Sequence, residues 1–531
     1  MRGRGGIGRR SGLKIRLPQA VRVRVPPSAP VQIWKIACRL TAVMVACILP
    51  FALSGCGWFS ASGPVRIAAI GDLHRNTDRA TTAQTLPDRL LLDATAQGLV
   101  SYASDGQVEA GLAERWTVID TGKSYIFRLR QARWNDGRPV RAIDVAELLR
   151  RRLNSSRLRP MLRGEFRSVR DVRAMTAKVI EIRLTRAQPD LLDLLAQPDM
   201  ALMRNGHGWG PLKASWSGGT TTLTPVPMMA MVAGGEDGSA DEPEPIAMFW
   251  GASTLSAVTQ FDQGEVAAVL GGRFEGWPFV TAAGINQQSV VIDPVEGLFG
   301  LAIVSDNGVM ADGLARDAVN MAIDRTALVA ALGSPGWTGR VALRSRRNQA
   351  AGAVQPVYPA WLDFSRAERV RRATAIIADW RQRHGGSRPI LRIALPIGPG
   401  ASIVFARIRA DFGAIGIDTQ RVPISAQADL RLIDEVAPSS DPAWILRRLG
   451  CGRGLVCDPA TSALLAKIDE APDSAARIAA IGTAEEAIMR YAGYIPIAAP
   501  LRWSLSSAVT PGIRANIRGR HSLYRLQNSP D

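Results

Sequence analysis

The sequence predicts an α/β protein that is divided into two or three lobes. Its 531 residues exceed what a single hydrophobic core usually accommodates. A strand at Ile390–Leu395, a helix at 401–412 and a strand at 417–423 follow one another, which is the pattern of helices layered on a sheet. Because 47% of the residues are hydrophobic and only 21% are charged, the chain should fold rather than stay disordered.

Further elements are expected in order along the chain. Alternating apolar residues predict strands at Val65–Ile70, 116–118, 125–129 and Val179–Leu184. Asp144 should cap one helix, residues 311–332 should form another, and Ser365 with Glu368 should begin a third through a capping box. Residues 218–245, which are rich in Gly, Thr, Pro and acidic residues, should form a surface excursion.

The net charge of +18 is concentrated near the amino terminus. Residues 1–55 contain ten basic residues and no acidic one, so the other 476 residues carry a net charge of only +8. In that larger part, Lys and Arg are scattered among acidic residues, without the basic stripe and stacking aromatics that nucleic-acid binding requires. We therefore expect no nucleic-acid partner.

Residues 1–55 have the pattern of a secretory signal peptide. The segment 40–55 is almost wholly apolar or small and follows Lys35 and Arg39, which is the order of charged, apolar and small regions in such a signal. The segment is short for a membrane span, and Pro50 disfavours a continuous helix. Residues 1–30 precede the usual length of a signal, so we expect the true start of translation downstream of Met1.

The end of this segment, Leu53-Ser54-Gly55-Cys56, resembles a bacterial lipobox. In that signal, lipid is attached to the cysteine thiol and cleavage makes the cysteine the first residue. A thiolate suits this alkylation because it is a good nucleophile. The alternative is a buried cysteine in a plain signal-anchor helix. We expect a lipid at Cys56, a tether over 56–64 and a location outside the cytoplasm, at a membrane.

Cys451 and Cys457 enclose a short Gly-rich loop far from the signal region. In an oxidising compartment, this spacing predicts a disulfide. The alternative, a metal site, would need further ligands, and the four histidines are scattered without ligand spacing. We expect the disulfide and no metal site.

Five segments, in order, resemble the family 5 bacterial extracellular solute-binding proteins, which serve ABC importers of oligopeptides, dipeptides and nickel. Each segment alone is a weak signal, and their order along the chain behind a lipobox is the specific feature. The similar segments are 105–108 with 111–116, 134–140 with 142–145, 208–213, 315–325, and Gly416 and Ile417 with Asp441 and Pro442.

The resemblance implies a two-lobed periplasmic-binding-protein fold of type II, cluster C-like, with an extra subdomain in the first lobe. By analogy, lobe I covers 65–306 with the subdomain at about 98–203, lobe II covers 307–495, and 496–531 returns to lobe I. Solute is held in such proteins as the lobes close about a hinge.

The sequence departs from the family pattern at positions that hold the solute between the lobes in other members. Peptide-binding members carry an aspartate three residues before the acid of their "DP" or "EP" pair, and here that position is Pro438. An ammonium group buried without a charged partner is costly, so a standard peptide ligand is not expected. The candidate ligand-binding residues are aromatic rings that could stack on a solute and an acid that could pair with a cation: Trp134, Trp209, Trp444 and Asp441. The alternatives are core packing for each Trp and a turn for Asp441.

No pattern for catalysis is present in the sequence. Residues 117–124 end like a phosphate loop but lie between two strands, as in a hairpin. Without a nucleophile–base or metal constellation, we expect no catalytic residue, no cofactor and no enzyme. The resemblance implies a monomeric, lipid-anchored receptor that delivers a small solute, peptide-like in kind, to the membrane-spanning permease of an ABC importer. The alternative is a degenerate relative that acts as an envelope interaction or sensory protein without transport.

Overall fold

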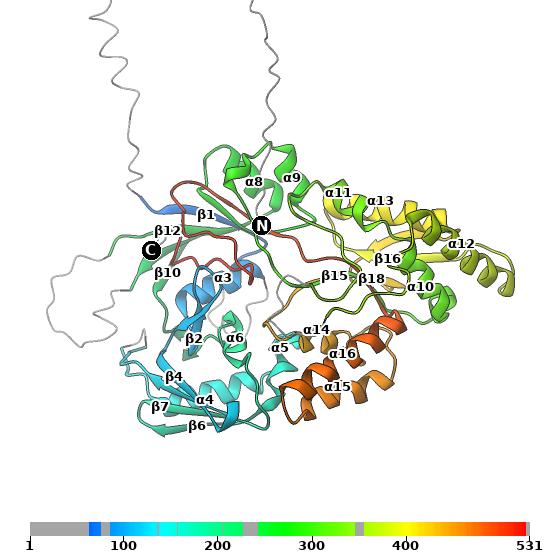
Figure 1. Ribbon diagram of the computed structural model, residues 1–531. Coiled ribbons are helices and arrows are strands. Elements are labelled where there is room, and N and C mark those ends of the chain that lie inside the picture. The colour runs from blue at the N-terminus through cyan, green and yellow to red at the C-terminus, as the bar shows by residue number, and fades with distance from the viewer. Residues whose placement is uncertain are drawn as a thin grey trace, which may run out of the picture. The chain divides into compact units, whose positions relative to one another are not determined.

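The computed structural model describes residues 63–75, 85–134, 137–156, 158–204, 206–226, 243–345 and 355–526. Residues 63–531 form one compact unit, and its described part is built on three main sheets (Figure 1). The predicted signal, the lipidation site and nearly all of the tether lie outside the described residues. Within the described residues, no helix combines the length and the apolar character needed to cross a membrane.

The first lobe is built on a seven-stranded sheet with the order β10-β11-β12-β1-β13-β20-β14. Strand β1, at its centre, is parallel to both neighbours, β12 and β13, and the other pairs are antiparallel. Strand β20 comes from the carboxyl-terminal part of the chain, which returns to this lobe (red in Figure 1). The strands are β1 (Val65–Ile70), β10 (Leu212–Ser217), β11 (Thr220–Pro225), β12 (Ala247–Ala252), β13 (Ala268–Arg273), β14 (Val290–Ile292) and β20 (Arg502–Ser506).

In the described part of lobe I, three helices accompany this sheet. Helix α3 begins with a capping box. The Thr85 hydroxyl accepts from the backbone amide of Asp88, and the Asp88 carboxylate accepts from the backbone amide of Thr85. Two amides that have no partner within the helix are therefore hydrogen-bonded. Its apolar residues, including Leu90 and Leu91, pack on the sheet with Ile67 and Phe249. The three helices are α3 (Leu86–Thr95), α8 (Thr254–Asp262) and α9 (Trp277–Ala282).

A subdomain is inserted between α3 and β10. Its four-stranded antiparallel sheet has the order β4-β5-β7-β6, and the predicted hairpin at 117–124 joins β4 to β5. Its separate hydrophobic core runs from Leu99 to Trp209. The elements are β2 (Val100–Tyr102), β3 (Val108–Ala110), β4 (Ala113–Ile119), β5 (Ser124–Leu129), α4 (Ala142–Leu153), α5 (Pro160–Arg163), β6 (Val169–Thr176), β7 (Val179–Leu184), α6 (Leu191–Leu195), β8 (Met203–Arg204) and β9 (His207–Gly208).

The second lobe is built on a five-stranded sheet with the order β17-β16-β18-β15-β19. Strands β16 and β17 are parallel and joined by α13, so the β-α-β unit expected from the sequence is present. The elements are β15 (Gly297–Ile303), α10 (Gly313–Ala322), α11 (Arg325–Leu332), α12 (Arg366–Arg383), β16 (Ile390–Leu395), α13 (Pro399–Ala414), β17 (Asp418–Pro423), β18 (Leu430–Val436), α14 (Ala443–Arg448), α15 (Ala460–Glu470), α16 (Ser474–Tyr491) and β19 (Tyr494–Ala498).

The chain crosses between the two sheets twice, at 293–296 and 499–501. The boundaries expected at 306/307 and 495/496 therefore need correction. Strand β15, assigned to lobe I from the sequence, pairs with β18 and β19 in lobe II. Every residue of β15 is buried, so its apolar sequence is equally compatible with either lobe. Its lobe is determined by its pairing with strands that are distant in sequence, β18 and β19.

Three local expectations also differ from the structure. The helix expected at 311–332 is two helices, because Asp324 caps α11 by accepting from the amide of Ala327. The residue preceding α4 is Arg141, and Asp144 lies in the first turn instead, where its charge favours the helix dipole. The excursion expected at 218–245 contains strand β11, which pairs on both sides.

Candidate functional site

The candidate site is the face where the two lobes meet. Apolar packing contributes to it, as between Phe274 of lobe I and Phe299 of lobe II, whose rings lie 4.9 Å apart. A short polar stretch of lobe II, residues 434–441, contributes as well, and we call it the interlobe segment. This segment contains the end of β18 and the loop that leads to α14. Polar contacts connect this segment to lobe I and the subdomain at three points, the third of them through Arg447 of α14.

The first contact is an ion cluster around Asp434. Arg273, at the end of β13, lies 2.8 Å from one carboxylate oxygen of Asp434, and Arg502, on β20, lies 2.8 Å from the other. The Asp434 side chain is only 4% exposed. Burial by itself raises the pKa of Asp434, but the guanidinium groups of Arg502 and Arg273 outweigh it and hold that pKa below its ordinary value. The carboxylate is therefore charged, and it joins the two lobes.

The second contact is a hydrogen-bonded group at Pro438 and Ser440. The side-chain amide of Gln197 in the subdomain donates to the carbonyl of Pro438 at 2.7 Å. Arg518 donates to the hydroxyl of Ser440 at 2.9 Å and pairs with Asp193 at 2.7 Å. The interlobe segment is thus held from two sides, at the Pro438 carbonyl by the subdomain and at the Ser440 hydroxyl by the carboxyl-terminal part of lobe I.

The third contact is a buried group of carboxylates and arginines. Asp441 pairs with Arg447 at 3.0 Å and with Arg477 at 2.8 Å, and Arg447 also pairs with Glu165 of the subdomain. Asp190 lies beside them, and oxygens of Glu165, Asp190 and Asp441 lie within 4.8 Å of one another. Burial, and then the charge of Asp441, raise the pKa of Asp190 to about 6.

The four predicted ligand-binding residues do not come together in one site. Trp134 is 1% exposed and Trp209 is 6% exposed, and both lie in the core of the subdomain. Trp444 is 1% exposed in a different core, beneath the interlobe segment. Asp441 does lie at the interlobe face, but its carboxylate is paired with arginines. The three tryptophans are thus placed as the core-packing alternative predicts, because rings of that size fill interiors.

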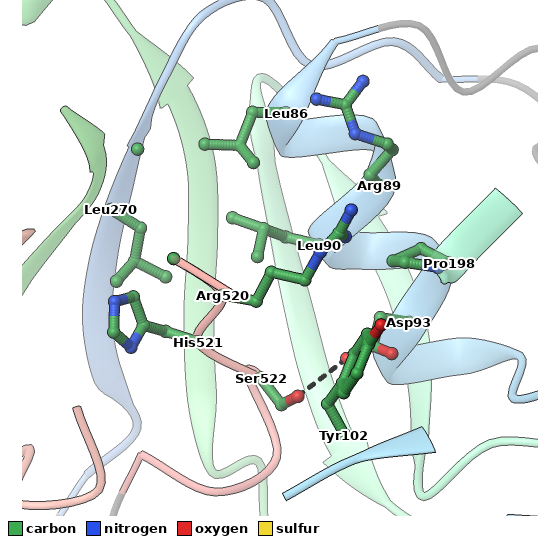
Figure 2. A pocket seen from close by; sticks show the side chains of 12 residues that line it. Leu86, Arg89, Leu90, Asp93, Tyr102, Pro198, Leu270, Arg520, His521 and Ser522 are labelled. Atoms are coloured by element: carbon green, nitrogen blue, oxygen red, sulfur yellow. Dashed lines mark hydrogen bonds between the residues drawn. The ribbon is translucent and has the colours of Figure 1, made fainter. Parts of the chain in front are cut away.

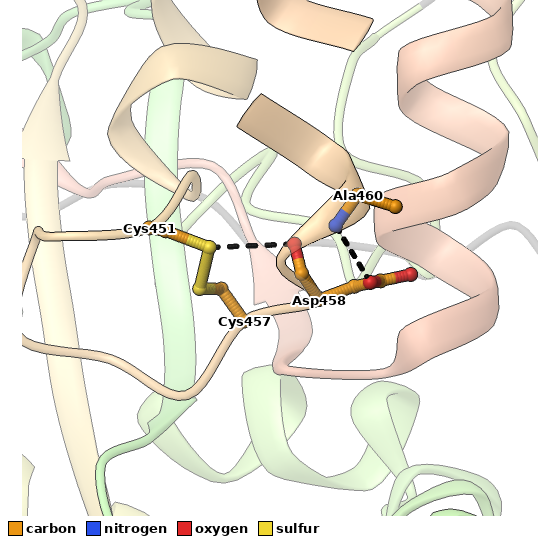
Figure 3. Close-up of a disulfide and its surroundings, with 4 residues drawn as sticks. All are labelled: Cys451, Cys457, Asp458 and Ala460. Atoms are coloured by element: carbon orange, nitrogen blue, oxygen red, sulfur yellow. Dashed lines mark hydrogen bonds between the residues drawn. A yellow bond between two sulfur atoms is a disulfide. The ribbon is translucent and has the colours of Figure 1, made fainter. Parts of the chain in front are cut away.

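Cys451 and Cys457 are joined by a disulfide with an S–S distance of 1.94 Å (Figure 3). The disulfide closes the loop that precedes α15, where the carboxylate of Asp458 accepts from the amide of Ala460 at 2.9 Å. The predicted lipidation site, Cys56, lies outside the described residues.

A hollow lies next to the second contact, between α3 and the carboxyl-terminal part of the chain (Figure 2). In Figure 2 the side chain of Arg520 extends from the carboxyl-terminal segment toward α3, which carries Arg89, Leu90 and Asp93. Arg520 also donates to the side-chain oxygen of Gln197, the residue whose amide reaches Pro438. Gln197 therefore links this hollow to the interlobe segment.

A larger hollow, of about 790 Å³, lies where the two crossing segments pass between the lobes. Its lining includes Glu296 and Leu501 from the crossings and Arg340, Ser345 and Trp361 from lobe II. Arg340 is paired with Glu296 at 2.9 Å. Ser345 directly precedes residues outside the described part, so this volume refers to the described residues alone.

One protein family matches part of the chain. Residues 107–226 match the family model described as "Bacterial extracellular solute-binding proteins, family 5 Middle". The resemblance seen in the sequence motifs is confirmed by this match. Among curated proteins, the probable deoxycholate-binding periplasmic protein YgiS of Escherichia coli is 49% identical over 49 residues. That match spans only 9% of this chain and 9% of YgiS.

Solved structures match almost the whole chain. The OppA protein of Haemophilus influenzae, in complex with the peptide RPPGFSPFR, has a TM-score of 0.72 and 16% identity, and the match covers 87% of this chain and 99% of OppA. The murein tripeptide binding protein MppA of Escherichia coli has a TM-score of 0.72 and 17% identity, over 87% of this chain and 98% of MppA. This chain has the two-lobed periplasmic-binding-protein fold.

Proposed function

We propose that this chain is an extracytoplasmic receptor that binds a small solute between its two lobes and delivers it to an ABC importer. The observation that carries the proposal is the two-lobed fold, shared over 87% of the chain with two binding proteins. The ion cluster at Asp434 supports it further, because contacts between lobes must be reversible if the protein is to open and close around a solute.

The solute we propose is small and peptide-like, but it differs from an ordinary peptide at its amino terminus. The proteins that resemble this chain bind, by their names, a peptide, a murein tripeptide and deoxycholate. The position that holds an acid in peptide-binding members is Pro438 here, and its carbonyl already accepts from Gln197. A free ammonium group would find no charged partner at that position.

We further propose that the receptor is a lipoprotein attached through Cys56 and that it catalyses no reaction. The lipobox-like Leu53-Ser54-Gly55-Cys56 supports the anchor. Replacing Cys56 with Ser should release the protein from the membrane fraction into the soluble fraction, and metabolic labelling with palmitate should be lost at the same time. Labelling that persists in Cys56→Ser would contradict the anchor.

A second candidate is a degenerate relative that acts as an envelope interaction or sensory protein. One observation favours it: the interlobe segment is held at all three points by the protein's own side chains. Such a protein would be compact without solute. Gene neighbours that encode a permease and an ATPase would favour transport, whereas recovery of a specific membrane partner other than a permease would favour this candidate.

A screen of solutes by thermal shift separates the two candidates. Peptides, metal chelates, opines and sugars are each titrated against the purified chain at fixed pH and ionic strength. A solute that binds only the folded state raises the melting temperature by mass action, and small-angle scattering of the same samples should show compaction. A protein that unfolds cooperatively but responds to none of the four classes would contradict the receptor.

A further inference from the structure

A further concave surface is formed by the subdomain alone. Three neighbouring parts of the chain build it: the end of α4, the segment 160–168 that contains α5, and the start of β6. Helix α4 packs on β6 within the subdomain (Figure 1). We call this surface the basic pocket, and its lining includes Arg150, Arg163, Phe166, Arg167, Arg170 and Asp171.

Local structure places an arginine in each of these parts. Arg150 lies in the last turn of α4, where a positive charge favours the carbonyl end of the helix dipole. Arg163 is the last residue of α5, Arg167 lies in the turn between α5 and β6, and Arg170 is the second residue of β6. All four arginines are exposed, whereas Phe166, next to Arg167, is buried in the core of the subdomain.

The basic pocket carries more positive than negative charge. Four arginines line it, and Asp171 is the acid among its lining residues. The carboxylate of Asp171 is already paired with Arg173, which brings a positive charge of its own. Arg150 and Arg163 donate to backbone carbonyl groups at 2.9 and 3.1 Å, and a neutral carbonyl does not compensate a charge. The potential of the pocket is therefore positive.

Arg167 and Arg170 are the arginines most available to a ligand. Among the described residues, neither has a hydrogen-bond or ion-pair partner. Two exposed arginines alone would hold an anion only weakly, because water solvates them well. Here Arg150 and Arg163 line the same pocket, so an anion would meet four guanidinium groups, each with a planar fork of donors and weaker hydration than an ammonium group.

The size and the charge of the basic pocket fit a phosphate group. Its volume is about 340 Å³, within the range of about 300–1,000 Å³ that sites for small molecules occupy. A phosphate monoester carries a charge of about −1.5 to −2 near neutral pH and has three acceptor oxygens, so several guanidinium groups can bind it at once. A carboxylate carries less charge and fewer oxygens, and would use fewer of the four arginines.

A nucleic-acid strand fits the basic pocket less well. The aromatic residue of its lining, Phe166, is only 5% exposed, so its ring offers little surface on which a base could stack. The positive charge is gathered in one pocket rather than along a stripe. A single phosphate group with a small substituent matches both features.

We propose that the basic pocket binds the phosphate group of a phosphate monoester, whether a soluble ester or the headgroup of a lipid. Arg167 and Arg170 bind its oxygens, and Arg150 and Arg163 complete the positive surroundings. This proposal goes beyond the proposed function, because the pocket lies within the subdomain and not between the lobes. It can be tested without knowing the solute of the receptor.

The direct test uses inorganic phosphate and glycerol phosphate as probes. Each is titrated against the purified chain by calorimetry and by thermal shift, with chloride replacing it at constant ionic strength. We expect saturable binding and a raised melting temperature. Binding should weaken by about ten-fold or more when Arg167→Gln and Arg170→Gln are combined, since a hydrogen bond to a charged group contributes at least that ratio.

Arg115→Gln is the matched control. Arg115 is exposed on β4 of the same subdomain and does not line the basic pocket, so this variant should bind both probes as the wild type does. Because Arg167 and Arg170 are exposed, the double variant should keep its fold, which circular dichroism and urea unfolding check. Should it not fold, each single variant makes the same comparison.

Three results would overturn the proposal. The first is no saturable binding beyond chloride for either probe. The second is equal binding in the wild type and the double variant. The third is a loss of the same size in Arg115→Gln, which would indicate general attraction by the net charge of the chain.

Vesicles distinguish a lipid headgroup from a soluble ester. The Cys56→Ser chain, which lacks the proposed lipid attachment, is sedimented with vesicles of phosphatidylcholine alone and with vesicles that also contain phosphatidic acid, a phosphate monoester. Retention that requires phosphatidic acid and is lost in the double variant assigns the pocket to a lipid headgroup. Binding of glycerol phosphate without such retention assigns it to a soluble ester.

Failure of this proposal is distinguishable from failure of the proposed function. A solute that binds between the lobes should stabilise the wild type and the double variant equally, because both substituted arginines line the basic pocket. Such a solute in the absence of any phosphate binding would leave the receptor intact and overturn the phosphate site. Phosphate binding with no response to any solute would support the phosphate site and count against the receptor.

Discussion

Asp190 lies beside two other carboxylates at the interlobe face, and one of its oxygens, Oδ2, has no hydrogen-bond partner among the described residues. Its neighbours Glu165 and Asp441 are both paired with Arg447. Arg447 and Arg477 already pair with these two carboxylates, so a third negative charge, on Asp190, is poorly compensated. Its buried position also offers little water to solvate the charge. The raised pKa of Asp190, about 6, has this physical origin.

Replacing Asp190 with Asn should therefore change how stability depends on pH. The folded protein holds a proton on Asp190 between its ordinary pKa of 3.8 and about 6, whereas the unfolded chain releases it. The contribution of Asp190 to the free energy of unfolding therefore falls as pH rises through this window, and the full penalty is present above pH 6. Asp190→Asn should be more stable than the wild type at pH 7 by roughly 1–3 kcal/mol.

Urea unfolding at pH 4.5 and pH 7 measures this difference. The gap between Asp190→Asn and the wild type should be small at the lower pH and wide at the higher one. Asp379→Asn, which removes an exposed acid from α12, serves as the control. A gap that is the same at both pH values would mean that Asp190 is charged throughout the range.

At the scale of elements, the sequence predicts helices and strands correctly where their structure depends on residues that are near in sequence. The β-α-β unit at 390–423 is correct, since its strands and helix each carry their own pattern and pair with the nearest neighbour. The break between α10 and α11 was missed, although Asp324 is a good capping residue, because the apolar pattern continues through it. Strand β15 was misassigned because its partners, β18 and β19, are more than a hundred residues away.

The start of α12 offers a test of local structure. Ser365 accepts from the amide of Glu368 at 3.2 Å, which is one half of the predicted capping box. The Glu368 carboxylate pairs instead with Arg371 and Arg372. Ser365→Ala removes this acceptor and should lower the free energy of unfolding by about 1 kcal/mol. Ser365→Asp keeps an acceptor and should recover most of the loss in chemical unfolding. Equal loss in both variants would indicate that side-chain packing rather than capping is responsible.

At the scale of the whole molecule, the candidate site is assembled from parts that are distant in sequence. Arg273, Asp434 and Arg502 come from two sheets, and Arg89 and Arg520 come from opposite ends of the described chain. The sequence contains a hint of such a contact, the two acids Asp434 and Glu435 at the end of strand β18. No local spacing connects Asp434 to Arg273 and Arg502, so the family motifs led instead to tryptophans that belong to the cores.

The same distant contacts predict how the lobes respond to loss of one charge. Asp434→Asn removes the charge that Arg273 and Arg502 share. Because the Arg273 side chain is 44% exposed and Glu275 lies 3.6 Å from it, water and Glu275 compensate part of the loss, and the cost should be smaller than the roughly 3–5 kcal/mol of a fully buried pair. Opening of the lobes would expose Arg502, which is 15% exposed in the structure, more fully to water. We therefore expect a larger radius of gyration in small-angle scattering of the variant without solute. Asp429→Asn is the matched control, because Asp429 pairs with Arg392 within lobe II. If both variants scatter like the wild type while the chain remains folded, the charge of Asp434 does not hold the lobes closed. Other interlobe contacts, such as those at Pro438, between Arg186 and Asp469 and between Phe274 and Phe299, are then sufficient for closure.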